Sequence, residues 1–348
     1  MSSQRHVLVA GGAGYIGSVL CRRLLDAGHH VRAFDALLYG NGESLAGVAE
    51  RPRFEFVRGD LRDRAEVGTA VHGVTDVVLL AALVGDPVCK RNPELARATN
   101  LDGARGLIAA ASEAGVGRFV FASTCSNYGL IEGDRLATEA DGLNPLSLYA
   151  ETKVEMEREL LEHLQGPSFA PTVLRIATAF GISPRMRFDL TVAEFTRDLV
   201  LGRPLEVYDA DTWRPYCHVE DISAAIVAIL EAPEEAIAGE IFNVGGEQGN
   251  QTKRMIVEAA RDALGGEGEV TWTEGGADAR NYRVSFEKIR DRLGFEPAHT
   301  IEGSIARLVG LIRAGMYGDI EARPLYYGNL ELAAPVIAGE GSGGGDAG

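Results

Sequence analysis

The sequence predicts an α/β protein in which a doubly wound parallel sheet is followed by a smaller C-terminal lobe. Two observations lead to this fold class. Short apolar runs alternate with amphipathic helical patterns through the first half of the chain, as expected of repeated strand and helix units. Beyond Gly181 the alternation fades into shorter, more widely separated segments. We therefore expect a first domain at residues 1–180 and a smaller lobe at 181–330, some segments of which return to the first domain.

The individual elements follow from the same patterns. In the first domain, strands are expected at 7–10, 30–34, 54–57, 77–80, 118–122 and 172–176, with helices at 18–27, 62–71, 93–114 and 148–164. In the lobe, helices are expected at 190–201, 221–231, 253–264 and 285–293, with strands at 205–208 and 241–244. The last segment, 339–348, contains only Gly, Ser, Ala and acidic residues. This composition cannot pack against a core, so we expect a disordered tail.

Composition limits the classes of function. The chain has 348 residues, of which 46% are hydrophobic, so it can bury a large core. Its formal charge of −16 and its pI near 5.0 argue against nucleic acid or an anionic membrane as a partner, because both call for basic patches. No apolar run approaches the roughly 18 residues of a membrane span, and the first strand begins too early to leave room for a signal peptide. We expect a cytoplasmic protein.

The cysteines indicate no disulfide framework and no metal site. Cys21, Cys89, Cys125 and Cys217 are scattered, without a Cys-x-x-Cys pair or a histidine at zinc-site spacing.

A glycine-rich turn at residues 11–17 joins the first predicted strand to the first predicted helix. Gly11, Gly14 and Gly17 let the backbone approach a ligand closely, and the positive end of the following helix favours an anion. The pyrophosphate of a dinucleotide meets both conditions. Residues 1–180 are therefore expected to form a Rossmann-type dinucleotide-binding domain, with the lobe binding the substrate.

Asp35 identifies the dinucleotide. It ends the second predicted strand, where a carboxylate can accept hydrogen bonds from the adenosine ribose. Ala36 and Leu37 follow it, so no cation stands there to meet the 2′-phosphate of NADP, and the carboxylate would repel that phosphate. The sequence favours NAD.

Tyr149 and Lys153 lie four residues apart and so share one face of a predicted helix. At this spacing an ammonium can favour the ionised phenol and lower its pKa from the usual value of about 10, which would make Tyr149 a general acid and base. An ordinary surface pair is the alternative interpretation. Thr124 belongs to a run of hydroxyl residues that follows the fifth predicted strand, where the sheet would bring it close to the nicotinamide.

Together, these motifs resemble the extended short-chain dehydrogenase/reductase family, particularly its NAD-dependent nucleotide-sugar epimerases and dehydratases, and among them enzymes like UDP-glucose/galactose 4-epimerase. The match extends over residues 6–330. The resemblance implies that Thr124, Tyr149 and Lys153 are catalytic, and that Lys153 also holds the nicotinamide ribose. It implies NAD contacts from Gly11, Gly14, Tyr15, Ile16, Gly17, Asp35, Asp60, Leu61, Ala81, Ala82, Asn100, Tyr149 and Lys153.

Four arginines are candidates for binding a nucleotide diphosphate-sugar. Arg214 stands in a segment similar to the family's Arg-x-Tyr-x-His-Val-x-Asp pattern, whose guanidinium meets the diphosphate through bidentate hydrogen bonds. Arg185 lies where substrate-binding loops occur in the family, and Arg280 and Arg283 are further candidates. Thr124 is expected to contact the sugar as well. Some of these arginines could instead pair with the chain's own acids, and His218 is interpreted as a structural residue.

Positions at which this chain differs from the family patterns reduce the number of reactions that it could catalyse. The 4,6-dehydratases carry an Asp-Glu pair directly after the catalytic Thr, whereas this chain has Cys125 and Ser126 there, and the glutamate of decarboxylating relatives is missing too. Cys125 stays a candidate for a carbon base. The remaining residues suffice for a 4-epimerase that oxidises the sugar at C4 and returns the hydride to the other face.

Two alternatives stay open. Thr178 stands where many sugar epimerases have a substrate-binding Asn, which leaves room for an NDP-sugar 4-dehydrogenase or ketoreductase. A dinucleotide-binding protein without catalysis would also share the fold. By resemblance we expect a homodimer formed through the predicted helices at 93–114 and 148–164.

Overall fold

The computed structural model describes residues 4–131, 133–163, 169–276, 278 and 280–332. The tail predicted at 339–348 lies outside these residues. In the described part of the chain, no helix is both long enough and apolar enough to cross a lipid bilayer.

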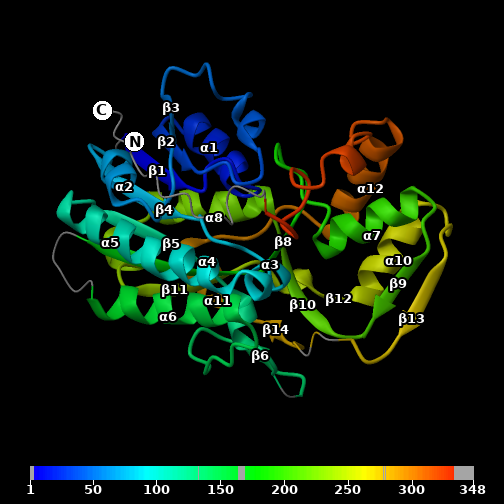
Figure 1. The fold of residues 1–348 in the computed structure, drawn as a ribbon. Coiled ribbons are helices and arrows are strands. Elements are labelled where there is room, and N and C mark those ends of the chain that lie inside the picture. Colours follow the sequence, from blue (N-terminus) through cyan, green and yellow to red (C-terminus); the bar gives the residue numbers. More distant parts are fainter. Residues whose placement is uncertain (1–3, 132, 164–168, 277, 279, 333–348) are drawn as a thin grey trace.

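The larger half of the molecule is built on a seven-stranded sheet with the order β11-β7-β5-β4-β1-β2-β3 (Figure 1). Its strands are β1 (His6–Ala10), β2 (His30–Asp35), β3 (Phe54–Arg58), β4 (Asp76–Leu79), β5 (Arg118–Thr124), β7 (Ala170–Ile176) and β11 (Glu240–Val244). All neighbouring strands pair in parallel. The strand order reverses between β1 and β4, and parallel sheets bind ligands at the carboxyl edge beside such a reversal. The predicted doubly wound parallel sheet is confirmed.

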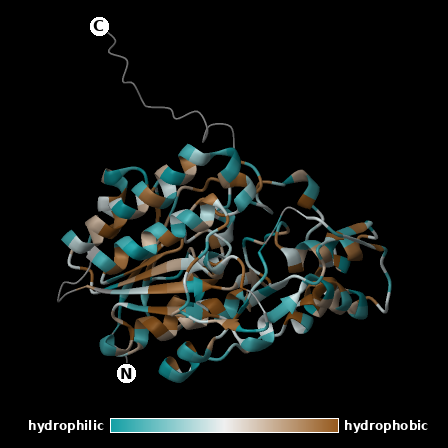
Figure 2. Ribbon diagram, turned by 90° about the horizontal axis from the view of Figure 1, so that it is seen from below, coloured by the Kyte–Doolittle hydropathy of each residue, from teal (hydrophilic) through white to brown (hydrophobic). Residues whose placement is uncertain are grey.

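Alternate strand residues build separate cores on the two faces of this sheet. Val7 and Val9 of β1 pack toward α1 (Gly17–Asp26), α8 (Val219–Glu231) and α11 (Glu287–Leu293). Leu8 and Ala10 pack toward α2 (Arg64–Val71), α5 (Ala104–Glu113) and α6 (Leu148–His163). The helices turn their polar sides outward, as the colouring of Figure 2 shows.

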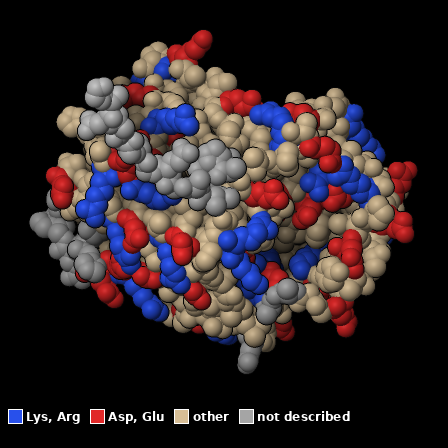
Figure 3. Space-filling model, viewed as in Figure 1, with Lys and Arg blue, Asp and Glu red and all other residues tan. Residues whose placement is uncertain are grey.

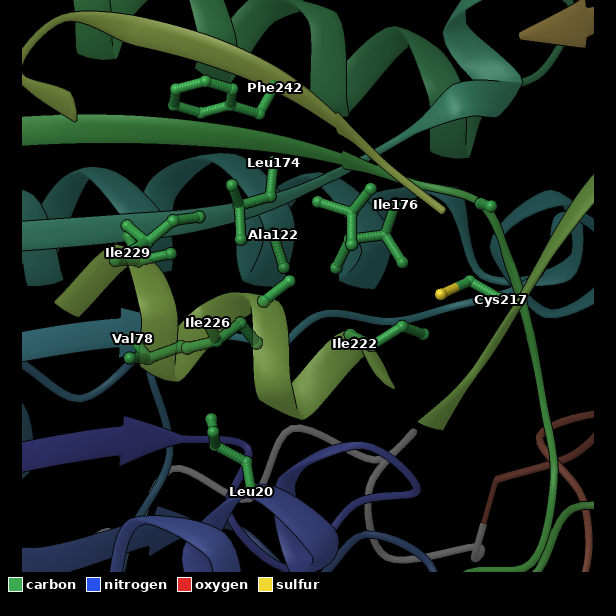
Figure 4. Packing of buried hydrophobic residues seen from close by; sticks show 14 of the residues in the cluster. Leu20, Val78, Ala122, Leu174, Ile176, Cys217, Ile222, Ile226, Ile229 and Phe242 are labelled. Atoms are coloured by element: carbon green, nitrogen blue, oxygen red, sulfur yellow. The ribbon is translucent and has the colours of Figure 1, made fainter. Parts of the chain in front are cut away.

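The α8 core shows why this helix covers the sheet. Ile222, Ile226 and Ile229 recur at helical spacing and are fully buried. In Figure 4 Ile226 and Ile229 lie near Ala122 and Leu174 of the sheet, and Ile222 lies nearer to Ile176 and Cys217. Since α8 comes from the second half of the chain, the two halves share one core.

The helix predicted at 93–114 is helical throughout from Pro93 to Glu113, but its hydrogen-bond pattern changes along its length. The structure divides it into α4 (Pro93–Arg97), a π-helical segment η2 (Ala98–Gly103) and α5, and it adds the unpredicted helix α3 (Asp86–Arg91). Within η2, the buried Asn100 bonds the backbone nitrogen and oxygen of Leu83, at 2.7 and 3.1 Å, in the loop after β4. Wider π-helical turns occur mostly as local insertions, frequently at functional sites.

The second half adds a smaller lobe, seen on the right in Figure 1. Its core joins α7 (Thr191–Val200), α10 (Lys253–Ala263), α12 (Ile301–Arg313) and β9 (Leu205–Tyr208). Helix α12 was not predicted, although Thr300 caps it by accepting a hydrogen bond from the Gly303 nitrogen at 3.1 Å. Strand β10 (Trp213–His218) lies between β8 (Thr178–Phe180) and β12 (Asn250–Thr252).

The remaining short elements connect these layers. They are β6 (Leu136–Ala137), β13 (Val270–Thr273), β14 (Arg283–Val284), α9 (Glu234–Ile237), η1 (Gly42–Leu45), η3 (Cys125–Tyr128), η4 (Glu247–Gly249) and η5 (Ile320–Ala322). On the face shown in Figure 3, acidic and basic side chains are interspersed.

Candidate active site

A cavity of about 460 Å³ lies along the carboxyl edge of the sheet. Most of the predicted site residues line it, namely Gly11, Gly14, Tyr15, Ile16, Gly17, Asp35, Asp60, Leu61, Ala81, Ala82, Thr124, Tyr149, Lys153, Arg185, Arg214 and Arg280. Residues far apart in the sequence therefore converge on one space. Of the predicted site residues, Asn100 and Arg283 lie outside this lining.

The glycine turn brings strand, turn and helix unusually close together. Gly11 has a φ of +87°, and a Cβ there would lie 2.7 Å from the backbone nitrogen of Ala81. A Cβ on Gly17 would collide with the carbonyl oxygen of Gly11. Only glycine, which has no Cβ, fits at these two positions. The backbone at the start of α1 is therefore exposed to the cavity without side chains in the way, as a pyrophosphate site requires.

Asp35 is fixed at the end of β2. Its carboxylate accepts hydrogen bonds from the backbone nitrogens of Ala13 and Leu37, at 3.0 and 2.8 Å. Burial raises the pKa of Asp35, and these two hydrogen bonds oppose the shift. The same carboxylate oxygens have lone pairs left for a ribose diol, so the site fits the adenosine half of NAD.

Tyr149 and Lys153 extend from α6 toward the end of β5. The Nζ atom of Lys153 donates a hydrogen bond to the Ala122 oxygen at 2.7 Å and lies 5.9 Å from the centre of the Tyr149 ring. Burial lowers the pKa of Lys153 to about 8. Burial raises the pKa of Tyr149, and the negative charge of Asp86 acts in the same direction. This is opposite to the direction predicted from the Tyr–Lys spacing, because the ammonium is directed at a carbonyl and burial disfavours the charged phenolate.

Glu157 is a buried residue that the sequence analysis missed. It lies one turn beyond Lys153 and is 2% exposed. Its carboxylate accepts a hydrogen bond from the Asn127 amide at 2.8 Å and pairs with the Arg175 guanidinium at 2.9 Å. Ser123 donates to it too. Glu157 thus joins α6 to the end of β5. The sequence feature that could have identified it is its position four residues after Lys153, the same spacing as that between Tyr149 and Lys153.

Arg214 and Arg280 share one acid at the lobe side of the cavity. Asp278 lies 3.0 Å from Arg214 and 2.8 Å from Arg280. Burial alone would raise the pKa of Asp278, but hydrogen bonds and charge from the two arginines hold it well below its usual range. Arg280 also lies 3.1 Å from Asp86 and 3.3 Å from the Ser126 hydroxyl. Both cations line the cavity, and Arg280 reaches Ser126, which follows the end of β5.

Arg185 and Arg187 form a second group of cations. Arg187 pairs with Asp189 through two hydrogen bonds, at 2.9 and 2.6 Å. Arg185 lies 4.6 Å from the centre of the Tyr39 ring and has no carboxylate partner among the described residues. Burial, reinforced by the charge of Arg187, lowers the pKa of Arg185 to about 10.

Arg283 and Asn100 have other roles. The guanidinium of Arg283 is bound to Asp134 and lies 5.0 Å from the Trp213 ring, so the structure gives it a surface ion pair in place of the predicted substrate contact. Asn100 supports the cavity wall by bonding Leu83 and, at 3.3 Å, the Thr152 hydroxyl of α6.

Two further side chains are removed from the chemistry. Cys125 is buried and outside the cavity lining, its thiol donates to the Arg175 oxygen at 3.1 Å, and burial raises its pKa. His218 caps α8, since its Nδ1 accepts a hydrogen bond from the Glu220 nitrogen at 3.1 Å. His218, Asp221 and His299 are near enough to hold a metal ion. However, the Asp221 carboxylate already binds the backbone and ring nitrogens of His299 at 3.0 and 2.9 Å.

Three proteins of known classes are similar to most of the chain. A low-salt glycan biosynthesis protein of Haloferax volcanii is 33% identical over 311 residues, which cover 87% of this chain and 97% of the relative. A dTDP-glucose 4,6-dehydratase of Streptomyces griseus is 32% identical, covering 87% and 93%. A UDP-glucose 4-epimerase of Corynebacterium glutamicum is also 32% identical, covering 84% and 91%.

Solved structures show the same relationship. The dTDP-glucose 4,6-dehydratase DesIV of Streptomyces venezuelae, with NAD and TYD bound, has a TM-score of 0.80 and 28% identity, covering 92% of this chain and 99% of its own. The UDP-glucose 4-epimerase of Thermus thermophilus, in complex with NAD, has a TM-score of 0.75 and 28% identity, covering 88% and 99%. Residues 7–245 match the model of the NAD-dependent epimerase/dehydratase family. The predicted cofactor class is thereby confirmed, and the chain belongs to this NAD-dependent family of the extended short-chain dehydrogenase/reductase group.

Proposed function

We propose that this protein is an NAD-dependent nucleotide-sugar 4-epimerase. One observation supports this reaction above the others: Thr124 and Tyr149 line the cavity together, while the positions directly after Thr124 provide no acid. Cys125 is buried against a backbone oxygen, and Ser126 offers only a hydroxyl. The chain thus has the groups for proton exchange at one sugar hydroxyl, without the acid pair that water elimination uses in dehydratases of the family.

Each cavity residue has its own role in the proposed reaction. Tyr149 removes the proton of the C4 hydroxyl and later returns it, while the Thr124 hydroxyl orients that oxygen. Lys153 holds α6 against β5 and places a positive charge near the phenol. Arg214 and Arg280 bind the diphosphate. When bound, oxidised NAD supplies a hydride acceptor and a positive charge that favours the Tyr149 phenolate.

Cavity-lining carboxylates support the proposal because each has a local partner. Asp60 pairs with Arg62 at 2.6 Å, Asp86 with Arg280 and Asp189 with Arg187. Among the described residues, no glutamate lines the cavity. An acid dedicated to removing water from the sugar is therefore missing near Thr124.

The test is turnover of UDP-, GDP-, dTDP- and CDP-sugars in D₂O. A 4-epimerase gives C4 epimers without NADH accumulation and without deuterium on carbon, because the hydrogen from C4 returns to C4. Loss of water with deuterium on the sugar carbons would instead identify a dehydratase. Tyr149→Phe should abolish turnover, and Arg292→Gln, on the far side of α11, is a matched control that should keep it.

A second candidate is net oxidoreduction by an NDP-sugar 4-dehydrogenase or ketoreductase. Thr178 favours it, since this residue lines the cavity where many sugar epimerases of the family carry a substrate-binding Asn. As a dehydrogenase, the protein would release a keto sugar with one NADH formed for each molecule converted. As a ketoreductase, it would consume one NADH for each keto sugar reduced.

We also infer a homodimer through α5 and α6. Arg105 of α5 binds Glu155 and Glu159 of α6, at 2.7 and 2.5 Å. These ion pairs join the two helices into one outward surface. Light scattering over a range of protein concentrations tests this inference.

A further inference from the structure

Unsatisfied polar atoms gather along the cavity near the glycine turn. Among the described residues, six buried side-chain atoms on lining residues lack a hydrogen-bond partner. Four of them are Nε of Arg185, Oη of Tyr39, Oδ1 of Asn41 and Oδ1 of Asn329. The other two, Oδ1 of Asp86 and Nη2 of Arg214, belong to residues that form salt bridges. Buried polar atoms without partners are costly. Several such atoms facing one cavity indicate a polar ligand.

Arg185 is the charged member of this group. Its side chain is 2% exposed. The Nη2 atom donates to the backbone oxygens of Leu325 and Gly328, at 3.4 and 3.2 Å, but no carboxylate of the described residues lies within salt-bridge distance. Neighbouring Arg187, by contrast, is neutralised by Asp189. The carboxylates of Asp35 and Asp189 act on Arg185 only from beyond salt-bridge distance, so a ligand anion in direct contact would stabilise this buried cation.

The segment that carries Arg185 is tied to the glycine turn. The Ser183 hydroxyl donates to the Tyr15 oxygen at 2.7 Å and lies 3.1 Å from the Ser18 hydroxyl. The Tyr15 hydroxyl donates to the Gly181 oxygen at 2.6 Å. The segment that contains Arg185 is therefore held beside the turn and the first residues of α1, where the helix end attracts phosphate.

The chain after α12 closes over this region. In Figure 1 it is the red segment that returns from the lobe toward the blue N-terminal half. Tyr327 accepts a hydrogen bond from the Phe188 nitrogen at 2.8 Å, and the Asn329 nitrogen donates to Asp189 at 3.0 Å. At its beginning, Arg323 is bound to Glu43 of η1. Residues 323–330 thus join the Arg185 segment to the strand β2 side of the cavity.

We propose that Arg185 binds the pyrophosphate of NAD and that residues 323–330 form a clasp that retains the cofactor between catalytic cycles. Arg185 is then a cofactor residue contributed by the second half of the chain, in place of the predicted substrate contact. Arg214 and Arg280, near Ser126, keep the substrate role. The clasp explains why the unsatisfied atoms come from both halves of the chain. It does not depend on which sugar reaction follows.

The test measures how fast NAD leaves the purified holoenzyme in the absence of sugar, with excess ADP-ribose added as a competitor. Arg185→Gln should release NAD about 10–100-fold faster, the range expected for losing charge-assisted hydrogen bonds. Arg185→Lys should release NAD more slowly than Arg185→Gln but faster than the parent protein, because lysine keeps the positive charge but lacks the two parallel N–H donors of the guanidinium. Glu43→Gln, outside the cavity, should speed release by loosening the clasp.

Controls separate this role from substrate binding and from a merely structural one. Arg280→Gln should leave NAD release unchanged and raise the KM for the sugar nucleotide. ADP-ribose should bind the Arg185→Gln variant more weakly while adenosine, which lacks the pyrophosphate, binds as in the parent. Parental NAD release in Arg185→Gln, an increase only in the KM for the sugar nucleotide, or an equal loss of adenosine binding would each overturn the proposal. If Arg185→Gln does not fold, Arg185→Lys decides by the same outcomes.

Discussion

The ammonium of Lys153 lies 2.7 Å from the carbonyl oxygen of Ala122, two residues before Thr124. This hydrogen bond ties the helix that carries Tyr149 to the strand that carries Thr124. The bond also keeps Lys153 buried, and burial lowers its pKa from 10.5 to about 8. The residue that assembles the site therefore costs the fold stability.

Replacing Lys153 by methionine should separate stability from activity. A lysine whose pKa is lower in the folded than in the unfolded protein destabilises the fold fully below the folded pKa, and the cost disappears as pH rises past the unfolded value. Lys153→Met should therefore abolish turnover while raising the free energy of unfolding at pH 7 by about 3 kcal/mol. Urea unfolding of both proteins at several pH values checks this prediction. The difference should shrink between pH 8 and 10.5, and a difference independent of pH would contradict it.

Asp86→Asn should move the pH profile of turnover. The negative charge of Asp86 contributes to the raised pKa of Tyr149, so its removal favours the phenolate. The rising limb of kcat/KM against pH should shift to lower pH. Asp60→Asn, near the glycine turn and paired with Arg62, is the matched control and should leave the limb in place.

The arginines should differ in their effect on substrate binding. Arg214→Gln and Arg280→Gln remove cavity cations and should each raise the KM for the sugar nucleotide about 10–100-fold, as expected for lost charge-assisted hydrogen bonds. Arg283→Gln breaks only an exposed pair with Asp134 and should keep the parental KM. A large effect at Arg283, with none at Arg214, would contradict the assignment of the diphosphate site.

Glu157→Gln should weaken the fold by about 3 kcal/mol, because it leaves the buried charge of Arg175 without its partner. Replacing both residues, as in Glu157→Gln with Arg175→Met, should restore part of the loss, since no unpaired charge is then buried. Urea unfolding of the two variants is the measurement. If the double variant is less stable than the single one, the ion pair is not the source of the effect.

Local patterns in the sequence account for the central sheet and for the first part of the site. Strands buried on both faces appear as continuous apolar runs, so the six strands of the first domain are found within two residues of their predicted bounds. The glycine turn, Asp35 and Tyr149 were recognised because each requires a fixed spacing next to a predicted element. Arg214 and Arg280 were expected at the substrate, and the structure places both in the cavity.

What the sequence missed depends on contacts between distant segments. The change to π-helical turns at η2 has no proline or glycine at its start that would predict it. It occurs where Asn100 contacts Leu83. The direction of the Tyr149 pKa shift depends on burial and on Asp86, neither of which the Tyr–Lys spacing reveals. The sequence gives no reason to distinguish Arg185 from Arg283. In the structure, Arg185 is buried under residues 323–330, whereas Arg283 pairs with Asp134 outside the cavity.

Strand β11 makes the sheet of the first half of the chain depend on a segment of the second half. Its residues pair with β7 from Glu240↔Thr172 to Val244↔Ile176, so the strand that protects the edge of β7 comes from the second half of the chain. A fragment that ends at residue 180 would expose a flat, apolar strand edge able to pair with other chains. Such a fragment is expected to aggregate, because the edge of β7 is covered only when β11 from the second half of the chain is present.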